Sequence, residues 1–459
     1  MATDVVVLAA GKGTRMKSSL PKVLHCLAGR PLLQHVVDAA NSLQTPKVII
    51  VTGHESDRVR SEIKGTDLCY VEQQLQLGTA HAVQQALPLV RCDATVLILY
   101  GDVPLIQPDT IQAMVDLAVD GSLVLLTAVL DDPSGYGRII RNSAKDVTAI
   151  VEQKDATPEQ LGIREVNTGV LALPAAKLKN WLPAIDNNNA QQEYYLTDII
   201  ALAHEDNCKI KTSQPLFPEE IEGVNNRSQL SRLERYYQRQ HSERLMMAGI
   251  TIADPARLDV RGKLTTGTDN YIDINVLFEG EVELGNNIHI GPNCVIIDSR
   301  IADGVEIKAN SIVEGSMIGP GCVVGPFARL RAGTEMAENA KIGNFVETKK
   351  SILGKGTKIN HLSYVGDAFL GANVNIGAGT ITCNYDGVNK HQTVIGDNAF
   401  IGSNTSLVAP VNIGKDATVG AGSTITCNVA EDELGLTRAE QRNIQGWKRP
   451  IKKIHPSSN

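Results

Sequence analysis

The feature that most constrains the fold is a six-residue hydrophobic period in the C-terminal half of the chain. Aliphatic residues stand six apart at Ile395, Ile401, Leu407, Ile413, Val419 and Ile425, and glycine follows four of them directly. This period matches neither the helical repeat of about 3.6 residues nor the alternation of a half-buried strand. It predicts a parallel β-helix from about Asp269, in which the aliphatic residue points into the coil and glycine turns the corner. A glycine-rich antiparallel sheet is the alternative, but it gives no reason for an unbroken repeat.

The N-terminal half alternates between strand-like and helix-like segments. Short apolar runs at Val5–Ala9, Val48–Thr52 and Val96–Tyr100 predict strands, and Pro31–Leu43 predicts a helix. The apolar face of that helix consists of Leu32, Leu33, Val36, Val37, Ala40 and Leu43. The alternation predicts an α/β sheet covered by helices, with ligands bound beyond the carboxyl ends of the strands.

The chain of 459 residues is too long for one hydrophobic core, because single cores stop growing near about 250–300 residues. We expect an N-terminal domain over residues 1–227, a helical linker over 228–248, and a C-terminal domain with a tail over 249–459. Ser231 and Glu234 form a possible capping box for the linker helix.

The composition favours a protein of the cytoplasm. The formal net charge of −7 gives no broad positive field for nucleic acid. No apolar run approaches the roughly 18–20 residues of a membrane span, and the first residues lack the basic start of a signal peptide. The eight cysteines include no C-x-x-C pair, so we expect reduced thiols rather than a zinc site. Membrane and nucleic-acid partners are therefore not expected.

A glycine-rich stretch follows the first predicted strand. It reads Leu8-Ala9-Ala10-Gly11-Lys12-Gly13-Thr14-Arg15-Met16, and Pro21-Lys22 comes soon after. The stretch is neither a P-loop nor a dinucleotide fingerprint. Its backbone N–H groups and the cations Lys12, Arg15 and Lys22 nevertheless suit a phosphate group. An ordinary turn is the alternative.

Asp102 follows the predicted strand Val96–Tyr100 at its carboxyl end. A carboxylate in this position can hold Mg²⁺ against phosphate oxygens. It can equally serve as a helix N-cap, and the sequence pattern alone does not separate the two roles.

The six-residue repeat breaks between about Phe327 and Thr393, where polar side chains gather. The segment from Thr382 to Ile395 is one residue longer than two repeats, so we expect a loop extruded at Asn384–Gln392. Function tends to lie where a solenoid is interrupted.

His361 lies in this segment and suits a general base for an amine substrate, because the unperturbed pKa of histidine is about 6.5. Glu347 is a candidate to orient its ring. The alternative is a surface histidine without a chemical role.

These motifs together resemble a known enzyme family. The stretch Leu8–Met16 with Pro21-Lys22 is similar to the signature of sugar-1-phosphate nucleotidyltransferases. Nearly the whole chain resembles the bifunctional N-acetylglucosamine-1-phosphate uridylyltransferases/glucosamine-1-phosphate N-acetyltransferases, and the resemblance includes Tyr100–Leu105, Glu222–Asn226 and Cys383–Gly387. It implies a Rossmann-like mixed α/β sheet joined by a long helix to a left-handed parallel β-helix of hexapeptide repeats.

By this resemblance, the N-terminal domain transfers UMP from UTP to N-acetylglucosamine 1-phosphate and releases pyrophosphate. Arg15 and Lys22 would act in catalysis, and Asp102 and Asn225 would bind Mg²⁺. The residues implied to bind UTP or UDP-N-acetylglucosamine are Leu8, Ala9, Gly11, Lys22, Gln73, Gly78, Thr79, Tyr100, Gly101, Asp102, Gly137, Glu152, Asn167, Tyr195 and Asn225.

The resemblance also implies that the C-terminal domain acetylates glucosamine 1-phosphate with acetyl-CoA, with His361 as the catalytic base. Glucosamine 1-phosphate would bind to Arg331, Lys349, Tyr364 and Asn375. Acetyl-CoA would contact Ala378, Asn384, Tyr385, Ser403, Ala421 and Arg438. Further implications are a homotrimer with clefts between subunits, a basic tail at Trp447–Lys453 that crosses a neighbouring site, and a product that feeds peptidoglycan and lipopolysaccharide synthesis.

Two other functions remain open at this point. The chain would be a single-activity nucleotidyltransferase if its β-helix only assembled subunits, but such a scaffold needs neither His361 nor the motif Asn384–Gly387. It would be a trimeric binding module if it carried no chemistry, but such a module gives no reason for Lys22 and Asp102 beside a glycine-rich loop.

Overall fold

The computed structural model describes residues 2–452 of the chain. Met1 and residues 453–459, which include Lys453 of the expected tail, lie outside this range. The chain divides into two compact units. The N-terminal unit comprises Met1–Leu245 with Leu258–Gly262, and the C-terminal unit comprises Met246–Arg257 with Lys263–Asn459.

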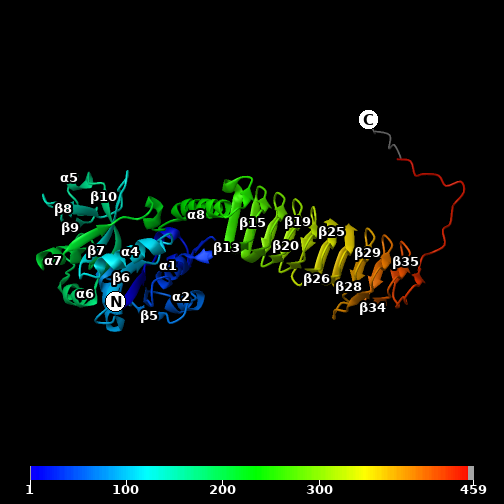
Figure 1. The fold of residues 1–459 in the computed structure, drawn as a ribbon, viewed down its shortest axis with the longest axis horizontal. Coiled ribbons are helices and arrows are strands. Elements are labelled where there is room, and N and C mark those ends of the chain that lie inside the picture. Colours follow the sequence, from blue (N-terminus) through cyan, green and yellow to red (C-terminus); the bar gives the residue numbers. More distant parts are fainter. Residues whose placement is uncertain (1, 453–459) are drawn as a thin grey trace, which may run out of the picture. The chain divides into compact units, whose positions relative to one another are not determined.

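The N-terminal unit is built on a nine-stranded mixed sheet (Figure 1). Strand β1 (Thr3–Ala9) lies parallel to and between β4 (Lys47–Thr52) and β6 (Thr95–Tyr100). The order across the sheet is β11-β7-β10-β6-β1-β4-β5, and β8 links β10 to β9. The other strands of this unit are β2 (Cys26–Leu27), β3 (Arg30–Pro31), β5 (Cys69–Glu72), β7 (Leu123–Val129), β8 (Arg138–Arg141), β9 (Val147–Val151), β10 (Glu165–Pro174) and β11 (Ile210–Ser213).

Helices pack on both faces of the sheet, because alternate residues of each strand point to opposite sides. Val5 and Val7 of β1 belong to one core, and Val6 and Leu8 belong to the other. The α-helices are α1 (Leu32–Asn41), α2 (Ser56–Glu62), α3 (Thr79–Ala86), α4 (Pro108–Ala118), α5 (Pro158–Leu161), α6 (Ala175–Trp181), α7 (Ile199–Glu205) and α8 (Arg227–Met247). The predicted α/β sheet is confirmed, and α1 buries the apolar face expected for it.

Helix α8 starts earlier than the capping signal predicted. The expected capping box at Ser231 and Glu234 is wrong, because both residues lie inside the helix. The cap is Asn226 instead: its side-chain oxygen accepts a hydrogen bond of 2.9 Å from the backbone N–H of Gln229, three residues on.

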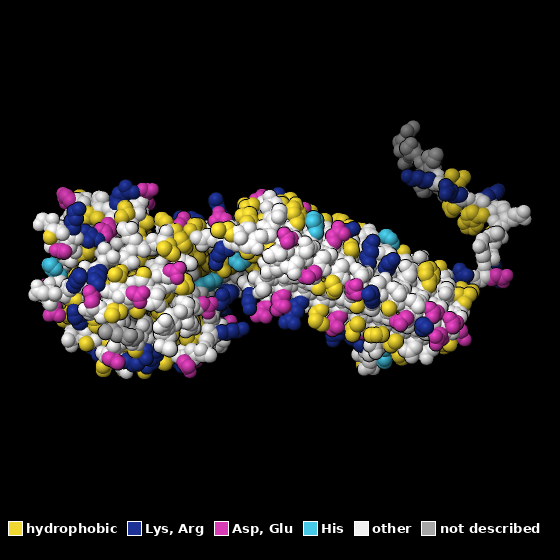
Figure 2. Space-filling view, in the orientation of Figure 1, with side chains coloured by type: hydrophobic (Ala, Val, Ile, Leu, Met, Phe, Trp, Pro, Cys, Tyr) yellow, Lys and Arg dark blue, Asp and Glu magenta, His cyan; other side chains and the backbone are white. Residues whose placement is uncertain are grey.

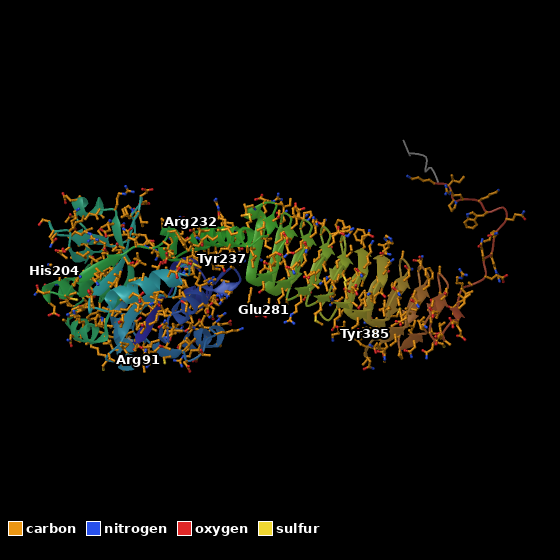
Figure 3. All side chains as sticks on the ribbon, viewed as in Figure 1. Arg91, His204, Arg232, Tyr237, Glu281 and Tyr385 are labelled. Atoms are coloured by element: carbon orange, nitrogen blue, oxygen red, sulfur yellow. The ribbon has the colours of Figure 1, made fainter. Side chains whose placement is uncertain are left out.

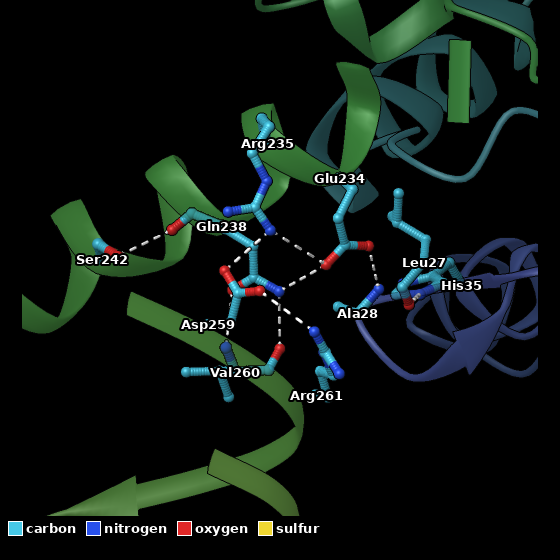
Figure 4. A network of polar contacts seen from close by, with 10 residues as sticks. All are labelled: Leu27, Ala28, His35, Glu234, Arg235, Gln238, Ser242, Asp259, Val260 and Arg261. Atoms are coloured by element: carbon cyan, nitrogen blue, oxygen red, sulfur yellow. Dashed lines mark hydrogen bonds and ion pairs between the residues drawn. The ribbon is translucent and has the colours of Figure 1, made fainter. Parts of the chain in front are cut away.

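The side chains of α8 instead fasten the helix to two other segments of the N-terminal unit (Figure 4). Glu234 accepts a hydrogen bond of 2.6 Å from the backbone N–H of Ala28, in the turn between β2 and β3. Gln238 is only 2% exposed, and its amide donates to the carbonyl of Val260 at 2.9 Å and accepts from the N–H of Val260 at 2.8 Å. Val260 belongs to strand β13 (Leu258–Thr266).

The C-terminal unit is a parallel β-helix whose coils stack side by side (Figure 1). Equivalent residues of successive coils lie 17 or 18 apart, so three hexapeptide repeats make one coil. Ile290 pairs with Ile307, and the same position continues through Val324, Ile342, Ile359 and Ile376. The six aliphatic residues that defined the period are all buried, so the predicted hexapeptide coil is confirmed.

The strands of the coil fall into two sheets. The first contains β12 (Thr251–Ile252), β14 (Tyr271–Ile272), β16 (His289–Ile290), β19 (Glu306–Ile307), β22 (Val323–Val324), β25 (Lys341–Asn344), β27 (Lys358–His361), β29 (Asn375–Ile376), β32 (Phe400–Ile401), β35 (Thr418–Val419) and β37 (Leu434–Gly435). The second contains β13, β15 (Val276–Leu284), β17 (Val295–Ile297), β18 (Arg300–Ile301), β20 (Ile312–Glu314), β21 (Met317–Ile318), β23 (Arg329–Leu330), β24 (Glu335–Met336), β26 (Glu347–Leu353), β28 (Tyr364–Leu370), β30 (Ile381–Cys383), β31 (Thr393–Ile395), β33 (Ser406–Val408), β34 (Val411–Ile413) and β36 (Thr424–Ile425).

The corners of the coil use left-handed backbone, and glycine is not always needed there. Asn275, Asn293 and Asn310 share one corner with φ near 60°, a conformation that asparagine tolerates well. Their side chains hydrogen-bond from coil to coil at 2.8 and 3.2 Å. Phe327 and Phe345 take the same corner with φ of 55°, and their rings stack 5.3 Å apart.

The repeat is therefore interrupted less than the sequence suggested. The expected break from Phe327 to Thr393 is wrong for most of its length, because β23 to β30 continue the coil without glycine at each corner. Between β23 and β37, the chain leaves the coil at Asn384–Gln392, where equivalent residues are 25 apart, so the predicted loop is confirmed.

The surface carries charges of both signs. Figure 2 shows acidic and basic side chains interspersed on the visible face of each unit, in keeping with the modest net charge of −7. Within residues 2–452, no helix is both long and apolar enough to cross a membrane.

Replacing Gln238 should destabilise the N-terminal unit. Gln238→Ala leaves the buried N–H and carbonyl of Val260 without partners, so the free energy of unfolding should fall by about 2–4 kcal/mol. Urea denaturation followed by the fluorescence of the buried Trp181 measures this change. Arg239→Ala on the same helix is the control: its side chain is 76% exposed, and its loss should cost less than about 0.5 kcal/mol. Equal stability of the two variants would contradict the prediction.

Candidate active sites

The N-terminal candidate site lies where β1 and β6 end side by side. The backbone N–H of Gly101 donates to the carbonyl of Leu8 at 2.9 Å, and the N–H of Val224 donates to the carbonyl of Asp102 at 2.9 Å. These bonds join three segments that are far apart in the sequence: the glycine-rich stretch, the residues after β6 and the segment before α8.

Four polar side chains meet at this junction. Lys22 Nζ contacts Asp102 Oδ2 and lies 3.3 Å from Asn225 Oδ1, and Arg15 Nη2 donates to the same Asn225 oxygen at 2.8 Å. The side chains of Lys22 and Asp102 are only 14% and 15% exposed, so little water screens their charges. The alternative role of Asp102 as a helix cap is not observed, since α4 begins at Pro108 and its N-cap position is Gln107.

A cleft of about 570 Å³ opens beside this cluster. Of the residues expected to bind nucleotide, its lining includes Leu8, Ala9, Gly11, Lys22, Gln73, Gly78, Thr79, Tyr100 and Asp102. Gln73 is buried, and its amide nitrogen donates to the carbonyl of Gly78 at 3.0 Å. Gly78 has φ of 115°, and a Cβ there would lie 2.5 Å from the carbonyl oxygen of Tyr194, so only glycine fits at this start of α3. The size and mixed polarity of the cleft suit a nucleotide.

The residues expected to hold the sugar lie together near Tyr100. Gly137 approaches Glu152 so closely that a Cβ on Gly137 would lie 3.3 Å from the carboxylate. The carbonyl of Gly137 accepts a hydrogen bond of 2.8 Å from the N–H of Asn167. Burial raises the pKa of Tyr100, and the nearby charge of Glu152 raises it further.

Acidic side chains gather beside Glu152. Thr197 Oγ1 donates to Glu152 Oε1 at 3.3 Å, while burial raises the pKa of Glu152. Burial and neighbouring carboxylates, Asp155 among them, raise the pKa of Asp198 to about 6 and that of Tyr195 to about 12. Thr197 and Asp198 were not expected from the sequence, because no local motif marks them.

Asp102 and Asn225 have the chemistry of the expected Mg²⁺ site. Their side-chain oxygens both contact Lys22 Nζ, so both already face a cationic group. Mg²⁺ prefers oxygen ligands and is commonly held by one or two protein groups together with substrate phosphates. Among residues 2–452, no group of three or more His, Cys, Asp and Glu side chains is arranged for a metal ion.

In the C-terminal unit, His361 lies along one edge of the coil with several expected acetyl-CoA contacts. In the strand register, the position equivalent to His361 in each of the next three coils is occupied by Ala378, Ser403 and Ala421 in turn. Arg438 reaches the same edge, since a Cβ on Gly422 would lie 3.8 Å from its Cδ.

The ring of His361 is held by a residue that the sequence did not suggest. Its Nδ1 lies 2.9 Å from Asn344 Oδ1. The expectation that Glu347 orients His361 is wrong, because Glu347 pairs with Arg331 Nη1 at 3.0 Å. The coil register places Asn344, and not Glu347, opposite His361.

Cationic side chains gather on the neighbouring face of the coil. The ammonium of Lys390, and to a lesser degree the charge of Arg331, lowers the pKa of Lys349. Gly366 pairs with Lys349 in the neighbouring strand. The Tyr364 side chain lies over Gly366, so closely that a Cβ on Gly366 would be 2.4 Å from the Tyr364 hydroxyl. This arrangement of like charges suits an anion such as a phosphate group.

The loop Asn384–Gln392 carries two further expected contacts and brings Lys390 back to the coil. Asn384 Nδ2 donates to Asp367, and Tyr385, labelled in Figure 3, is 60% exposed. The N–H groups of Val388 and Asn389 donate to Asp386 Oδ1, which orders the loop tip. Sequence reasoning predicted the loop but missed Lys390, because no pattern shows which residue returns to Lys349.

One chain does not gather all the expected acetyltransferase residues on one surface. Tyr364 and Lys349 belong to the second sheet of the coil, whereas Asn375 belongs to β29 of the first sheet. His361 is the last residue of β27, which lies in the same sheet as Asn375, so it stands at a corner of the coil.

Comparisons with known proteins match both units. A MobA-like NTP transferase domain matches residues 5–165, a GMPPB C-terminal domain matches 260–346, and a hexapeptide repeat of succinyl-transferase matches 392–427. The protein named "Bifunctional protein GlmU" from Marinobacter nauticus is 62% identical over 98% of this chain and 99% of its own length. Proteins of the same name from Cellvibrio japonicus and Idiomarina loihiensis are 57% and 56% identical over 98% and 99% of this chain, and over 99% of their own lengths.

The chain belongs to the bifunctional GlmU family. This confirms the family, the fold and the pair of transferase activities that the sequence motifs implied. The relatives do not favour a single-activity enzyme with a purely structural β-helix, because they cover the whole chain and are named as bifunctional.

Replacing Gly13 should disrupt the N-terminal site alone. Gly13 has φ of 60°, and a Cβ there would lie 2.6 Å from Lys22 Cβ, so Gly13→Ala should displace Lys22 from Asp102. We expect a loss of uridylyl transfer of roughly 10- to 100-fold, the worth of a charged hydrogen bond, with acetyl transfer unchanged. Gly121→Ala is the control, because Gly121 has φ of 85° but open space around it. Full uridylyl transfer in Gly13→Ala would refute the prediction.

Replacing Asp198 should change the dependence of stability on pH. The folded pKa of about 6 lies above the ordinary 3.8, so the folded chain holds this proton more tightly and loses stability as the pH rises from about 4 to 6. Asp198→Asn should therefore raise the free energy of unfolding at pH 7.5 by about 1 kcal/mol, less than the full shift implies because the group is half-exposed. Urea denaturation at pH 7.5 and 4.5 tests this, since the gain should fall to roughly a third of its size at the lower pH. An equal gain at both values would point to a different cause.

Proposed function

We propose that the N-terminal unit transfers UMP from UTP to N-acetylglucosamine 1-phosphate, and that the C-terminal unit supplies this substrate by acetylating glucosamine 1-phosphate with acetyl-CoA. The observation that carries the first assignment is the meeting of Arg15, Lys22, Asp102 and Asn225 beside the nucleotide-sized cleft. The contact between His361 and Asn344 on the coil supports the second.

In the uridylyl transfer, a phosphate oxygen of the sugar attacks the α-phosphorus of UTP and pyrophosphate leaves. No covalent enzyme intermediate is needed, so positioning and charge neutralisation carry the catalysis. Lys22 and Arg15 lie within reach of one oxygen of Asn225, and we assign to them the stabilisation of charge on the transferring and leaving phosphates. Gly137, Glu152, Asn167 and Tyr195 hold the sugar.

Asp102 and Asn225 hold Mg²⁺ in this proposal. The ion would neutralise charge on the phosphates when bound. Lys22 contacts both of these oxygens and so keeps them facing one another.

In the acetyl transfer, His361 takes the proton of the substrate amine as the nitrogen attacks the thioester carbonyl of acetyl-CoA. The C–S bond then breaks, and the CoA thiolate receives this proton and leaves as the thiol. Arg331, Lys349 and Tyr364 bind the sugar phosphate, which the cationic face of the coil supports. Acetyl-CoA lies along the edge with Ala378, Ser403, Ala421 and Arg438, and Asn384 and Tyr385 contact it from the loop.

The site is completed by other copies of the chain in a homotrimer. The distribution of Asn375 and Lys349 over two sheets of one coil supports this assembly, because two copies can bring different sheets to one cleft. The basic tail, in which the described Trp447 is 70% exposed, would reach a neighbouring site. We also propose the cytoplasm as the place of action, where UTP and acetyl-CoA are available.

The two activities should fail separately in two single variants. Asp102→Ala should lower uridylyl transfer by about 10²–10³-fold and leave acetyl transfer intact. His361→Ala should lower acetyl transfer by about 10²–10⁴-fold and leave uridylyl transfer to supplied N-acetylglucosamine 1-phosphate intact. The measurement is mass analysis of products after incubation with glucosamine 1-phosphate, acetyl-CoA, UTP and Mg²⁺.

Matched controls for these variants are Asp131→Ala and His204→Ala, both at exposed positions of the N-terminal unit. Each should retain both activities. A loss of both activities in Asp102→Ala or in His361→Ala would reject independent sites, and full uridylyl transfer in Asp102→Ala would reject its role.

A further inference from the structure

The ring of His361 has one hydrogen-bond partner among residues 2–452, and that partner is Asn344. Asn344 Oδ1 lies 2.9 Å from His361 Nδ1. Ser363 also contacts His361, but its hydroxyl donates to the backbone carbonyl rather than to the ring. The orientation of the imidazole therefore depends on a single carboxamide.

The coil register holds this carboxamide in place. Asn344 ends β25 and is paired with His361, which ends β27. Two residues earlier in each strand, Ile342 and Ile359 are paired and fully buried. A shift of Asn344 relative to His361 would require these core positions to move, and packed interiors resist such shifts.

The contact has a chemical consequence for the histidine. A neutral imidazole carries its proton on one of two nitrogens, and a carbonyl oxygen can only accept a hydrogen bond. The oxygen of Asn344 therefore favours the form with the proton on Nδ1, which leaves the lone pair on Nε2. When Nε2 then takes a proton, the ring becomes a cation and its hydrogen bond to Asn344 strengthens.

A neutral amide does this without adding a negative charge to the site. The neighbouring face holds Arg331 and Lys349, which are proposed to bind a phosphate. Glu347, the carboxylate that the sequence suggested for this role, pairs with Arg331 instead.

We propose that Asn344 is a positioning residue for acetyl transfer: it fixes His361 in the form whose Nε2 accepts the proton of the substrate amine. The inference rests on the proposed function, in which His361 is the base. Its role in this proposal is exerted through the ring of His361.

The test compares Asn344→Ala with Asn344→Asp in the full chain. Asn344→Ala should lower kcat for acetyl transfer roughly 10- to 100-fold, with KM for both substrates within about twofold of the wild type. Asn344→Asp keeps an oxygen acceptor and should recover most of the lost kcat. Asn412→Ala, at an exposed asparagine of β34, should leave acetyl transfer unchanged. Circular dichroism and thermal unfolding of the same preparations report whether the β-helix of each variant is folded, because uridylyl transfer belongs to the other unit.

The double variant Asn344→Ala with His361→Ala separates positioning from an independent effect. If Asn344 acts through His361, the double variant should be no slower than His361→Ala alone. A wild-type kcat in Asn344→Ala, an Asp variant no better than the Ala variant, or a further loss in the double variant would each overturn the proposal. Retained acetyl transfer in His361→Ala would instead overturn the proposed base, whatever the Asn344 variants show.

Discussion

In-register pairing of parallel strands is the constraint on which both candidate sites depend. In the N-terminal unit, the register of β1 with β6 ends both strands together, and the bond from Gly101 to Leu8 sets Asp102 beside the glycine-rich stretch. In the C-terminal unit, the register of β25 with β27 sets Asn344 opposite His361. Neither pair of residues is close in sequence. The backbone ladder, rather than any local motif, brings the chemistry together.

The two proposed phosphate sites differ in how their cations are partnered. In the N-terminal unit, Lys22 contacts the carboxylate of Asp102, and both Lys22 and Arg15 contact the side-chain oxygen of Asn225. In the C-terminal unit, the charge of Lys390 lowers the pKa of Lys349, and the carboxylate of Asp367 opposes this effect. A bound anion would relieve the repulsion between the two lysines.

Much of the fold could be predicted, because its signals are periodic. The six-residue spacing from Ile395 to Ile425 determines which residues enter the coil, and the apolar runs of the N-terminal half determine its strands. Local exceptions were missed for physical reasons. The coil continues past Phe327 because a bulky residue can occupy a left-handed corner, and α8 is capped by Asn226 rather than by Ser231.

The candidate sites were predictable only where the residues follow one another in a motif. Lys22 and Asp102 stand beside recognisable stretches, and the structure brings them into contact. Asn344 and Lys390 belong to no recognisable motif. The role of Asn344 depends on its pairing with His361 in the next coil, and that of Lys390 depends on a loop that brings it to Lys349. Strand register and loop closure are long-range properties, so a reading of adjacent residues does not reveal them.

The double hydrogen bond between Gln238 and Val260 has a practical consequence for dividing this protein into halves. An N-terminal fragment that stops at the end of α8 would lack Val260. The side-chain amide of Gln238 would then lose both hydrogen-bond partners on Val260. A fragment that runs through Gly262 would keep the donor and the acceptor together. A boundary for separate expression of the N-terminal half therefore lies within β13, and not at the end of α8.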